Sequence, residues 1–303
     1  MKSGHVQPNA IKYLDPQFLA NIGNLELIAR SVVEGFITGL HKSPFHGFSV
    51  EFSQHRPYMP GDALRFVDWK VYGRTDRYYI KQFEEETNLR SYILLDVSSS
   101  MAYQSGKISK WMYASYLASA LAYLLLHQRD ATGLVLFDDQ VRLQMPPRSM
   151  GSYLRQMLRQ IEQVQLGNDT SVGKVLHRIA DQFRRRGLII LISDLLDDPV
   201  EIMKGLKHFR HDKHEVLVFH ILDRQEVEFE FNGNILFKDL ESGERVKTQP
   251  FFIREQYRER FRNFLKYYQL QTSKNNIDYQ QMFTDEPLNV ALAKFLSKRR
   301  RLF

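Results

Sequence analysis

The hydrophobic positions after residue 88 form short apolar runs separated by longer amphipathic stretches. The runs have the length of strands, and the stretches between them carry apolar residues at helical spacing. Repeated alternation of strand and helix predicts an α/β fold, in which a mostly parallel sheet has helices on both faces. The expected strands are 91–97, 131–137, 188–194, 215–222 and 277–283, with 141–145 as an antiparallel edge; the expected helices are 108–128, 151–163, 172–185, 199–210, 251–271 and 287–297.

The first 90 residues follow a different pattern. Apolar positions between residues 16 and 40 fit one amphipathic helix that ends near Gly39. From 48 to 86, short alternating runs around a turn at 57–62 predict a small β-rich segment. We therefore expect an N-terminal helix and small β segment in residues 1–90 and an α/β domain in residues 91–303.

One stretch of the α/β domain interrupts the rhythm of strand and helix. Residues at about 225–250 alternate with period two around Asn232 and Gly233, a pair typical of tight hairpin turns. The pattern predicts a β-hairpin inserted into the domain.

Composition narrows the chemistry that the chain can perform. The 303 residues include no cysteine, which excludes disulfides, thiolate zinc sites and thiol nucleophiles. Any metal ion must be bound by oxygen or imidazole. The N-terminus lacks the apolar core of a signal peptide, and no apolar stretch reaches the ~20 residues of a transmembrane helix. We therefore expect a cytoplasmic protein.

The net charge of +7 raises the question of a nucleic-acid partner. Lysine and arginine are scattered along the chain, apart from short runs at 184–186 and 298–301 that follow helix-like segments. Cations at such positions complement the negative end of the helix dipole. Because no basic stripe is interleaved with aromatic residues, we expect no specific nucleic-acid binding and keep a basic nucleic-acid-binding protein as an alternative.

Oxygen-bearing side chains follow two of the expected strands. Asp96, Ser98 and Ser100 form a D-x-S-x-S motif at the end of the first strand, Asp194 ends the strand at 188–194, and Thr170 lies in a loop before a helix. Ligands of open parallel sheets collect at the carboxyl ends of the strands. Carboxylate and hydroxyl oxygens suit a hard cation such as Mg²⁺. The predicted metal ligands are therefore Asp96, Ser98, Ser100, Thr170 and Asp194.

Two features of this predicted site are left open. Mn²⁺ and Ca²⁺ are alternative ions, and Asp169 is an alternative ligand beside Thr170. A competing interpretation is that Asp96 and the serines only cap the next helix. Hydroxyl ligands donate little charge, so a bound ion would retain affinity for an acidic side chain of another protein.

This arrangement resembles the von Willebrand factor A domain, whose metal-ion-dependent adhesion site combines D-x-S-x-S with a threonine and an aspartate from later loops. The resemblance maps these ligands onto Asp96, Ser98, Ser100, Thr170 and Asp194. It implies a Rossmann-type sheet and a role in metal-dependent protein–protein interaction.

Residues 39–52, 56–76 and 79–88 carry ordered elements, among them Pro60-Gly61-Asp62 and Asp68-Trp69, that resemble the signature of the bacterial "domain of unknown function 58" family. Genes of this family usually neighbour those of MoxR-type AAA+ ATPases. The resemblance implies an adaptor or accessory factor for a MoxR-type AAA+ ATPase acting on client proteins. The sequence specifies neither the client nor the oligomeric state.

The main rival is an enzyme, a Mg²⁺-dependent phosphatase or phosphotransferase with Asp96 as nucleophile. Haloacid dehalogenase-type sites need D-x-D-x-T, and Ser98 stands where the second aspartate would supply an acid. Neither a G-x-S-x-G elbow nor a glycine-rich phosphate loop with lysine is present. We therefore expect no enzymatic activity.

His208, His211 and His214 form a weaker second metal candidate, because no carboxylate accompanies them.

Overall fold

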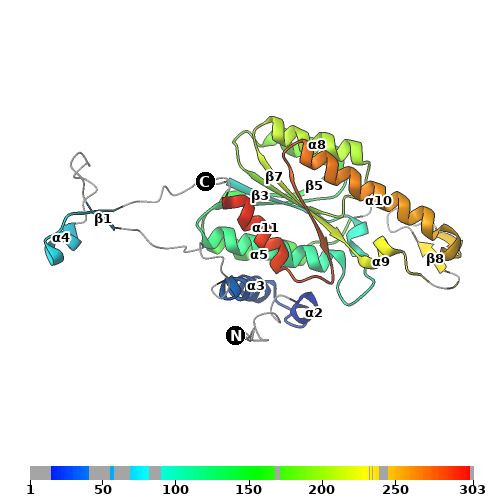
Figure 1. The fold of residues 1–303 in the computed structure, drawn as a ribbon, viewed down its shortest axis with the longest axis horizontal. Helices are drawn as coiled ribbons and strands as arrows, with labels where there is room; N and C mark the ends of the chain where they lie inside the picture. Colours follow the sequence, from blue (N-terminus) through cyan, green and yellow to red (C-terminus); the bar gives the residue numbers. More distant parts are fainter. Residues whose placement is uncertain are drawn as a thin grey trace, which may run out of the picture.

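The computed structural model describes residues 15–40, 55–57, 69–81, 90–167, 171–231, 233, 235–238 and 245–300. Its centre is a six-stranded sheet with the order β10-β7-β6-β3-β4-β5 (Figure 1). The strands from β10 to β4 are parallel, and β5 pairs with β4 in the antiparallel direction. The predicted mostly parallel sheet is confirmed. The strands are β3 (Arg90–Asp96), β4 (Ala131–Phe137), β5 (Val141–Arg148), β6 (Leu188–Ser193), β7 (Glu215–Leu222) and β10 (Asp278–Phe283).

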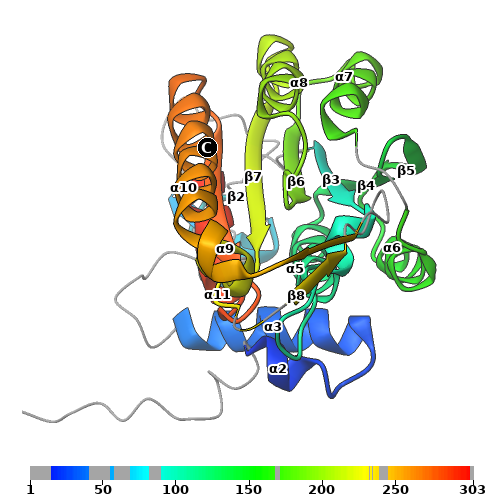
Figure 2. The same ribbon diagram turned by 90° about the vertical axis from the view of Figure 1, so that its right-hand side faces the viewer.

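Helices cover both faces of this sheet, as the resemblance to the von Willebrand factor A fold implies (Figure 2). Successive side chains of β3 point to opposite faces, so Ile93 and Leu95 enter one hydrophobic core and Leu94 enters the other. The first core is covered by α3 (Leu25–Leu40), α5 (Lys110–His127), α6 (Ser152–Gln163) and α11 (Asn289–Arg300). The second is covered by α7 (Val172–Gln182), α8 (Pro199–His211) and α10 (Pro250–Lys274).

The N-terminal helix is interrupted, which corrects the predicted continuous helix over 16–40. A short helix, α2 (Pro16–Leu19), precedes α3, and Gly23 between them has a φ of +67° that most residues adopt only with strain. The side chain of Asn24 then accepts the backbone N–H of Leu27 at 3.1 Å and starts α3. Apolar residues of α3 such as Val32 pack in the core beside α5.

The small β-rich segment contains two short strands and a helix. β1 (His55–Pro57) pairs antiparallel with β2 (Tyr79–Lys81), and α4 (Trp69–Thr75) lies between them in sequence. Beyond Pro57, the predicted turn at 57–62 lies outside the described residues. Several of the family-signature residues lie outside them as well. The division of the chain after residue 90 stays a prediction.

The insertion forms a hairpin, but not around Asn232 and Gly233 as predicted. Its strands are β8 (Ile235–Lys238) and β9 (Arg245–Thr248), and the residues before them form a helix, α9 (Arg224–Glu228). The prediction from the alternating pattern was wrong here. Phe229 does not belong to a strand, because its ring packs on Tyr257 of α10, with centroids 4.2 Å apart. Figure 1 shows α9, β8 and the start of α10 beyond the carboxyl ends of the parallel strands.

The described helices include none that is long and apolar enough to cross a membrane.

Candidate metal site at the carboxyl end of the sheet

Asp96 is the last residue of β3, at the centre of the sheet, and its side chain is fully buried. Its Oδ1 atom accepts the backbone N–H of Ser98 at 2.9 Å, and its Oδ2 atom accepts the hydroxyl of Ser193 at 2.5 Å. Ser193 ends the neighbouring strand β6. The D-x-S-x-S loop therefore begins with a carboxylate oriented by groups from two strands.

The competing interpretation, that this loop only caps the next long helix, does not fit the hydrogen bonds. A short 3₁₀ turn, Ser99–Ala102, follows Ser98, whose side chain makes no capping bond to it. The N-terminus of α5 is capped by Ser109, whose hydroxyl accepts the N–H of Met112 at 3.1 Å. Asp96 and Ser98 therefore do not cap α5.

The remaining hydroxyls connect Asp96 to Asp194. Ser98 Oγ lies 3.0 Å from Ser100 Oγ, and the Ser100 hydroxyl hydrogen-bonds to the Asp194 carboxylate. Asp194 follows β6, is 1% exposed, and accepts the N–H of Leu196 at 3.3 Å. Four of the predicted ligands, Asp96, Ser98, Ser100 and Asp194, thus belong to one buried hydrogen-bond network.

Thr170 and the alternative ligand Asp169 lie outside the described residues. The residues on either side are fixed at the same edge of the sheet. The N–H of Gly167 donates to the carbonyl oxygen of Val97 at 2.7 Å, and the N–H of Gly173 donates to Asp197 Oδ2 at 3.3 Å. Of the residues that flank 168–170, Gly167 therefore lies beside the D-x-S-x-S motif and Gly173 beside the loop after β6.

Lys110, which was not among the predicted site residues, lies between the carboxylates of Asp194 and Glu226. Its Nζ atom lies 2.8 Å from Asp194 Oδ2 and 2.8 Å from Glu226 Oε1, and the residue is fully buried. One sequence signal was available. Lys110 begins α5, where the positive end of the helix dipole disfavours a cation, and an apolar helix follows it.

Burial and mutual interaction shift the pKa values of Asp96, Asp194 and Lys110. Burial raises the pKa of Asp96, and the nearby Asp194 carboxylate raises it further, to about 7, although hydrogen bonds from Ser193 and Ser98 oppose the change. Burial acts on Asp194 in the same direction, but the Lys110 ammonium lowers its pKa below the ordinary value. Burial alone would lower the pKa of Lys110, yet Asp194 and Glu226 raise it. Asp194 is therefore ionised and paired.

His220 fixes the backbone at Asp194. Its Nε2 atom lies 2.7 Å from the Asp194 carbonyl oxygen, which can only accept, so Nε2 carries the proton. The Nδ1 atom then accepts the Tyr279 hydroxyl at 2.6 Å. Burial lowers the pKa of His220 to about 4, which keeps the ring neutral at physiological pH. The ring is a structural support for the loop after β6.

The donor set fits a hard divalent cation. Two buried carboxylates and two hydroxyls converge, and oxygen is the ligand that Mg²⁺ prefers. Within the described ranges, no three His, Asp or Glu side chains could hold an ion together. A metal at this edge would therefore depend on the serine hydroxyls, as a D-x-S-x-S site requires.

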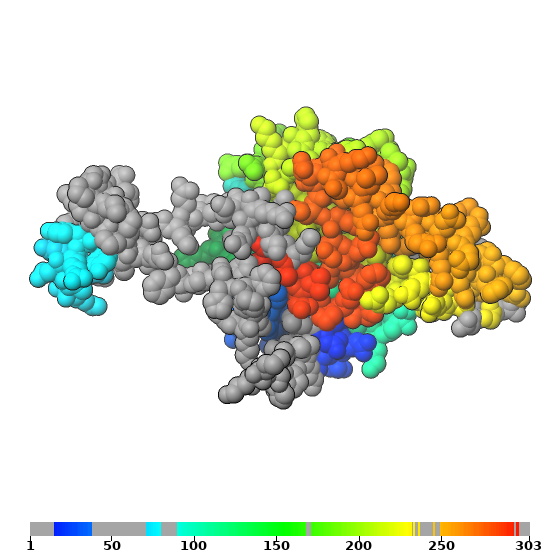
Figure 3. Space-filling view, in the orientation of Figure 1, coloured from blue at the N-terminus to red at the C-terminus, as the bar shows by residue number. Residues whose placement is uncertain are grey.

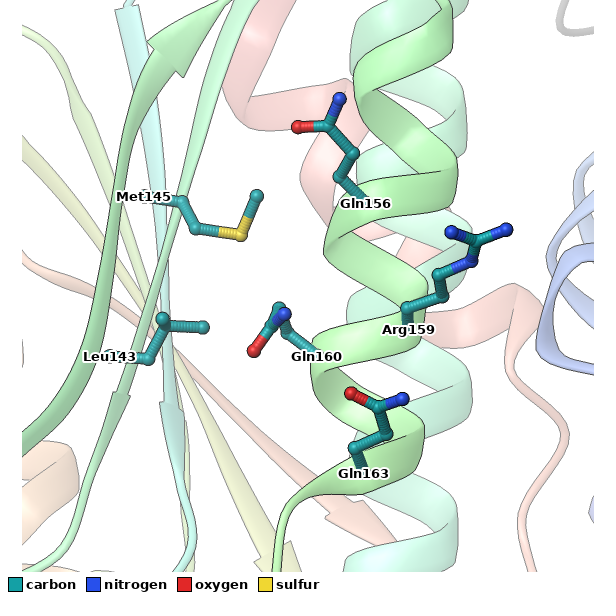
Figure 4. A pocket seen from close by; sticks show the side chains of 6 residues that line it. All are labelled: Leu143, Met145, Gln156, Arg159, Gln160 and Gln163. Carbon is teal, nitrogen blue, oxygen red and sulfur yellow. The ribbon is translucent and has the colours of Figure 1, made fainter.

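Two other places do not share this chemistry. A groove of about 390 Å³ lies between β5 and α6 and is lined by Leu143, Met145, Gln156, Arg159, Gln160 and Gln163, none of them a predicted ligand (Figure 4). The weaker histidine candidate does not converge either. The His214 ring is buried against Phe183, His211 is exposed, and His208 contacts His177 instead, with Nδ1 atoms 3.2 Å apart.

Two solved structures are similar to this chain at low sequence identity. A conserved hypothetical protein, BatB of Bacteroides thetaiotaomicron, is similar in structure, with 18% identity, a TM-score of 0.49 and coverage of 70% of this chain and 99% of that one. The SpRpn10 VWA domain has 12% identity and a TM-score of 0.40, covering 68% of this chain and 93% of its own.

In sequence, the chain is similar to the uncharacterized protein Rv1480 of Mycobacterium tuberculosis, with 28% identity over 232 residues that cover 76% of this chain and 73% of the relative. A family model described as "Protein of unknown function DUF58" matches residues 54–267, well over half of the chain. The chain therefore belongs to the DUF58 family.

Proposed function

We propose that this chain is a metal-dependent protein-interaction module rather than an enzyme. In this proposal Mg²⁺ is held by Asp96, Ser98, Ser100, Thr170 and Asp194 and accepts an acidic side chain from a partner protein. The observation that supports the proposal most directly is the buried hydrogen-bond network that joins Asp96 to Asp194 through the two serines.

The chain's own residues would give such an ion its selectivity for acids. Asp96 and Asp194 supply negative charge, while the serine hydroxyls complete the ligand set without adding charge. The bound ion would supply a positive centre that prefers an anionic oxygen. Ser193 orients Asp96, and His220 holds the backbone at Asp194, so both carboxylates are positioned before any partner arrives.

For the partner we propose a MoxR-type AAA+ ATPase, with this chain as an adaptor or accessory factor that presents client proteins to it in the cytoplasm. The family resemblance supports this choice. Any ATP hydrolysis would belong to the ATPase. Exposed aromatic residues near the same edge offer additional contact, because Phe251 and Phe252 at the start of α10 are 75% and 76% exposed. Figure 3 shows the surface of α10, in orange, extending to the right-hand end of the molecule.

The geometry does not favour the phosphatase alternative. A nucleophilic carboxylate must reach a phosphorus atom, whereas Asp96 is fully buried and both of its oxygens already accept hydrogen bonds. Retention on heparin or DNA across a salt series distinguishes the other alternative, a basic nucleic-acid-binding protein, from the proposed interaction module. Retention that falls steeply with salt and ignores Mg²⁺ would support that alternative instead.

The decisive experiment is capture of a MoxR-type AAA+ ATPase from the same organism by the full chain, with Mg²⁺ or with EDTA. The same capture is repeated with Asp96→Ala, with Thr170→Ala and with Ser98→Ala combined with Ser100→Ala. Asp181→Ala serves as the control, because this carboxylate is 70% exposed on α7 and touches none of the network. We expect capture to depend on Mg²⁺ and to be lost in the site variants alone. Equal capture in all samples would remove the metal from the function.

A further inference from the structure

Lys110, Asp194 and Glu226 form a buried ion cluster that the proposed metal site does not explain. A site built only to hold a divalent cation has no need of a lysine. Nevertheless, the side chain of Lys110 is 0% exposed, that of Asp194 1% and that of Glu226 17%. Removing three ionisable groups from water is costly unless they are paired, so their arrangement calls for a physical reason.

The three residues come from separate parts of the fold. Lys110 opens α5, Asp194 follows β6, and Glu226 lies on α9 in the insertion. The ammonium stands between the two carboxylates at 2.8 Å from each. It therefore has two equivalent acceptors, only one of which belongs to the predicted metal ligands.

We infer that Lys110 is a resident cation that competes with the divalent ion for Asp194, and that Glu226 retains Lys110 when the ion binds. This inference rests on the proposed function and deepens it, because it names the residues that set the metal affinity. In the metal-free protein Lys110 neutralises Asp194. When Mg²⁺ takes Asp194, Lys110 stays paired with Glu226.

Elementary electrostatics supports the exchange. An ammonium and a divalent ion repel each other strongly at a few ångströms in a buried site. Both cannot use Asp194 fully, so binding of Mg²⁺ weakens the contact of Lys110 with Asp194. The flexible four-carbon stem of lysine allows its ammonium to shift toward Glu226. Without Glu226 the displaced charge would be buried and unpaired, which is strongly unfavourable.

The insertion holds Glu226 ready for this role. Asp223 caps α9 by accepting the N–H of Gln225 at 2.9 Å. The same carboxylate accepts the hydroxyl of Ser105 at 2.6 Å and its N–H at 3.1 Å. Ser105 lies in the loop between the D-x-S-x-S motif and α5. Glu226 is therefore tied to the loop that leads from the proposed metal ligands to Lys110.

The test is titration of the full chain with MgCl₂ by isothermal calorimetry. Lys110→Met removes the charge and keeps the length of the side chain, while Glu226→Gln removes the second acceptor. Two matched controls carry the same charge changes at exposed positions, Lys107→Met in the neighbouring loop and Glu228→Gln on the same helix.

Opposite effects are expected from the two variants. Lys110→Met should bind Mg²⁺ about tenfold more tightly than the native chain, since its competitor is gone. Glu226→Gln should bind more weakly, by about threefold or more, because Lys110 is left with Asp194 alone. The combined variant should resemble Lys110→Met, and both controls should stay within about twofold of the native chain.

Other outcomes separate this inference from the proposed function. If the native chain and Lys110→Met bind Mg²⁺ equally, the inference is overturned while the metal site stands. If no protein binds Mg²⁺, both fail. Lys110→Met leaves Asp194 unpaired and is expected to be less stable without metal and stabilised more by Mg²⁺ than the native chain. Should it not fold even with Mg²⁺, Glu226→Gln decides alone, and unchanged affinity there overturns the inference.

Discussion

The hydroxyl of Ser193 donates to Asp96 Oδ2 at 2.5 Å, and the same oxygen of Ser193 accepts the backbone N–H of Leu195 at 2.9 Å. One buried side chain thus connects the end of β3 to the loop that contains Asp194. Ser193 ends a buried apolar strand, where its hydroxyl has little water to bond to. The contact therefore positions both carboxylates of the proposed site.

Replacing Ser193 by alanine should destabilise the metal-free protein. The change leaves a buried carboxylate and a backbone N–H short of a partner, which costs about 1–3 kcal/mol. We also expect weaker Mg²⁺ binding, because Asp96 loses its orientation. Urea denaturation and calorimetry measure the two effects. The control is Ser91→Ala, since the buried Ser91 hydroxyl has no hydrogen-bond partner among the described residues. A similar loss of stability in both variants would contradict the positioning role.

The stability of the metal-free protein should depend on the charge of Asp96. Burial and Asp194 raise its pKa in the folded chain to about 7, whereas an aspartate in the unfolded chain titrates near ~3.9. Between these pH values the folded chain retains a proton that the unfolded chain releases. The stabilisation is complete below about pH 4 and is lost as the pH rises to about 7, by on the order of 4 kcal/mol.

Asp96→Asn removes this titration and leaves the other groups in place. We compare urea denaturation of both proteins in EDTA from pH 4 to 8. The native chain should lose stability relative to Asp96→Asn as the pH increases. Parallel curves would show that Asp96 is ionised throughout this range in the folded protein.

Gly167 is expected to tolerate no larger residue. A Cβ atom at this position would clash with Asp138 Oδ2, and the Asp138 carboxylate is held by Arg142 Nε at 2.6 Å. Gly167→Ala should therefore cost about 1–3 kcal/mol and displace the loop that carries Thr170. Thermal denaturation and Mg²⁺ titration detect the two changes. Gly106→Ala is the control, because a Cβ there meets nothing within 4 Å. Equal behaviour of the two alanine variants would refute the steric explanation.

Phe251 and Phe252 should contribute to partner binding but not to metal binding. Tyr257 lies on the same helix. Burial and the charge of Glu226 raise the pKa of Tyr257 to about 12, so the two side chains interact. The two phenylalanines precede Tyr257 by five and six residues, about 8–9 Å along α10. Replacing both by serine should weaken capture of the MoxR-type ATPase by about tenfold or more and leave Mg²⁺ affinity unchanged.

Leu270→Ser is the control for this surface, because Leu270 is 50% exposed near the other end of α10. Equal weakening by both substitutions would mean that exposed apolar area on α10, rather than its position near the proposed metal site, governs the contact.

Strands buried on both faces were predicted most accurately. The bounds of β4 and β7 equal the predicted ranges 131–137 and 215–222, because a run of apolar residues between polar ends is a local signal. The placement of Asp96 and Asp194 at the same edge also followed from this local information, since Asp96 ends one parallel strand and Asp194 directly follows the neighbouring one.

Features that depend on distant contacts, or on the backbone conformation of a single residue, were not predicted. The contact of Lys110 with Glu226 joins residues 116 positions apart, and nothing within either segment identifies the other residue as its partner. The break between α2 and α3 depends on one glycine with positive φ inside an otherwise regular pattern. The alternating phenylalanines of the insertion indicated a strand, but Phe229 instead ends α9 in the left-handed region with φ +50°.

The shared carboxylate of Asp223 makes the insertion and the Ser105 loop a single cooperative unit. Opening one requires breaking hydrogen bonds of the other, so the amides of Ser105 and Gln225, which donate to the same side chain, should exchange with deuterium at similar rates. A partner that binds the outer surface of the insertion would thereby change the rigidity of the loop leading to α5. Binding at a distance from the sheet would then affect the buried residues at its carboxyl end.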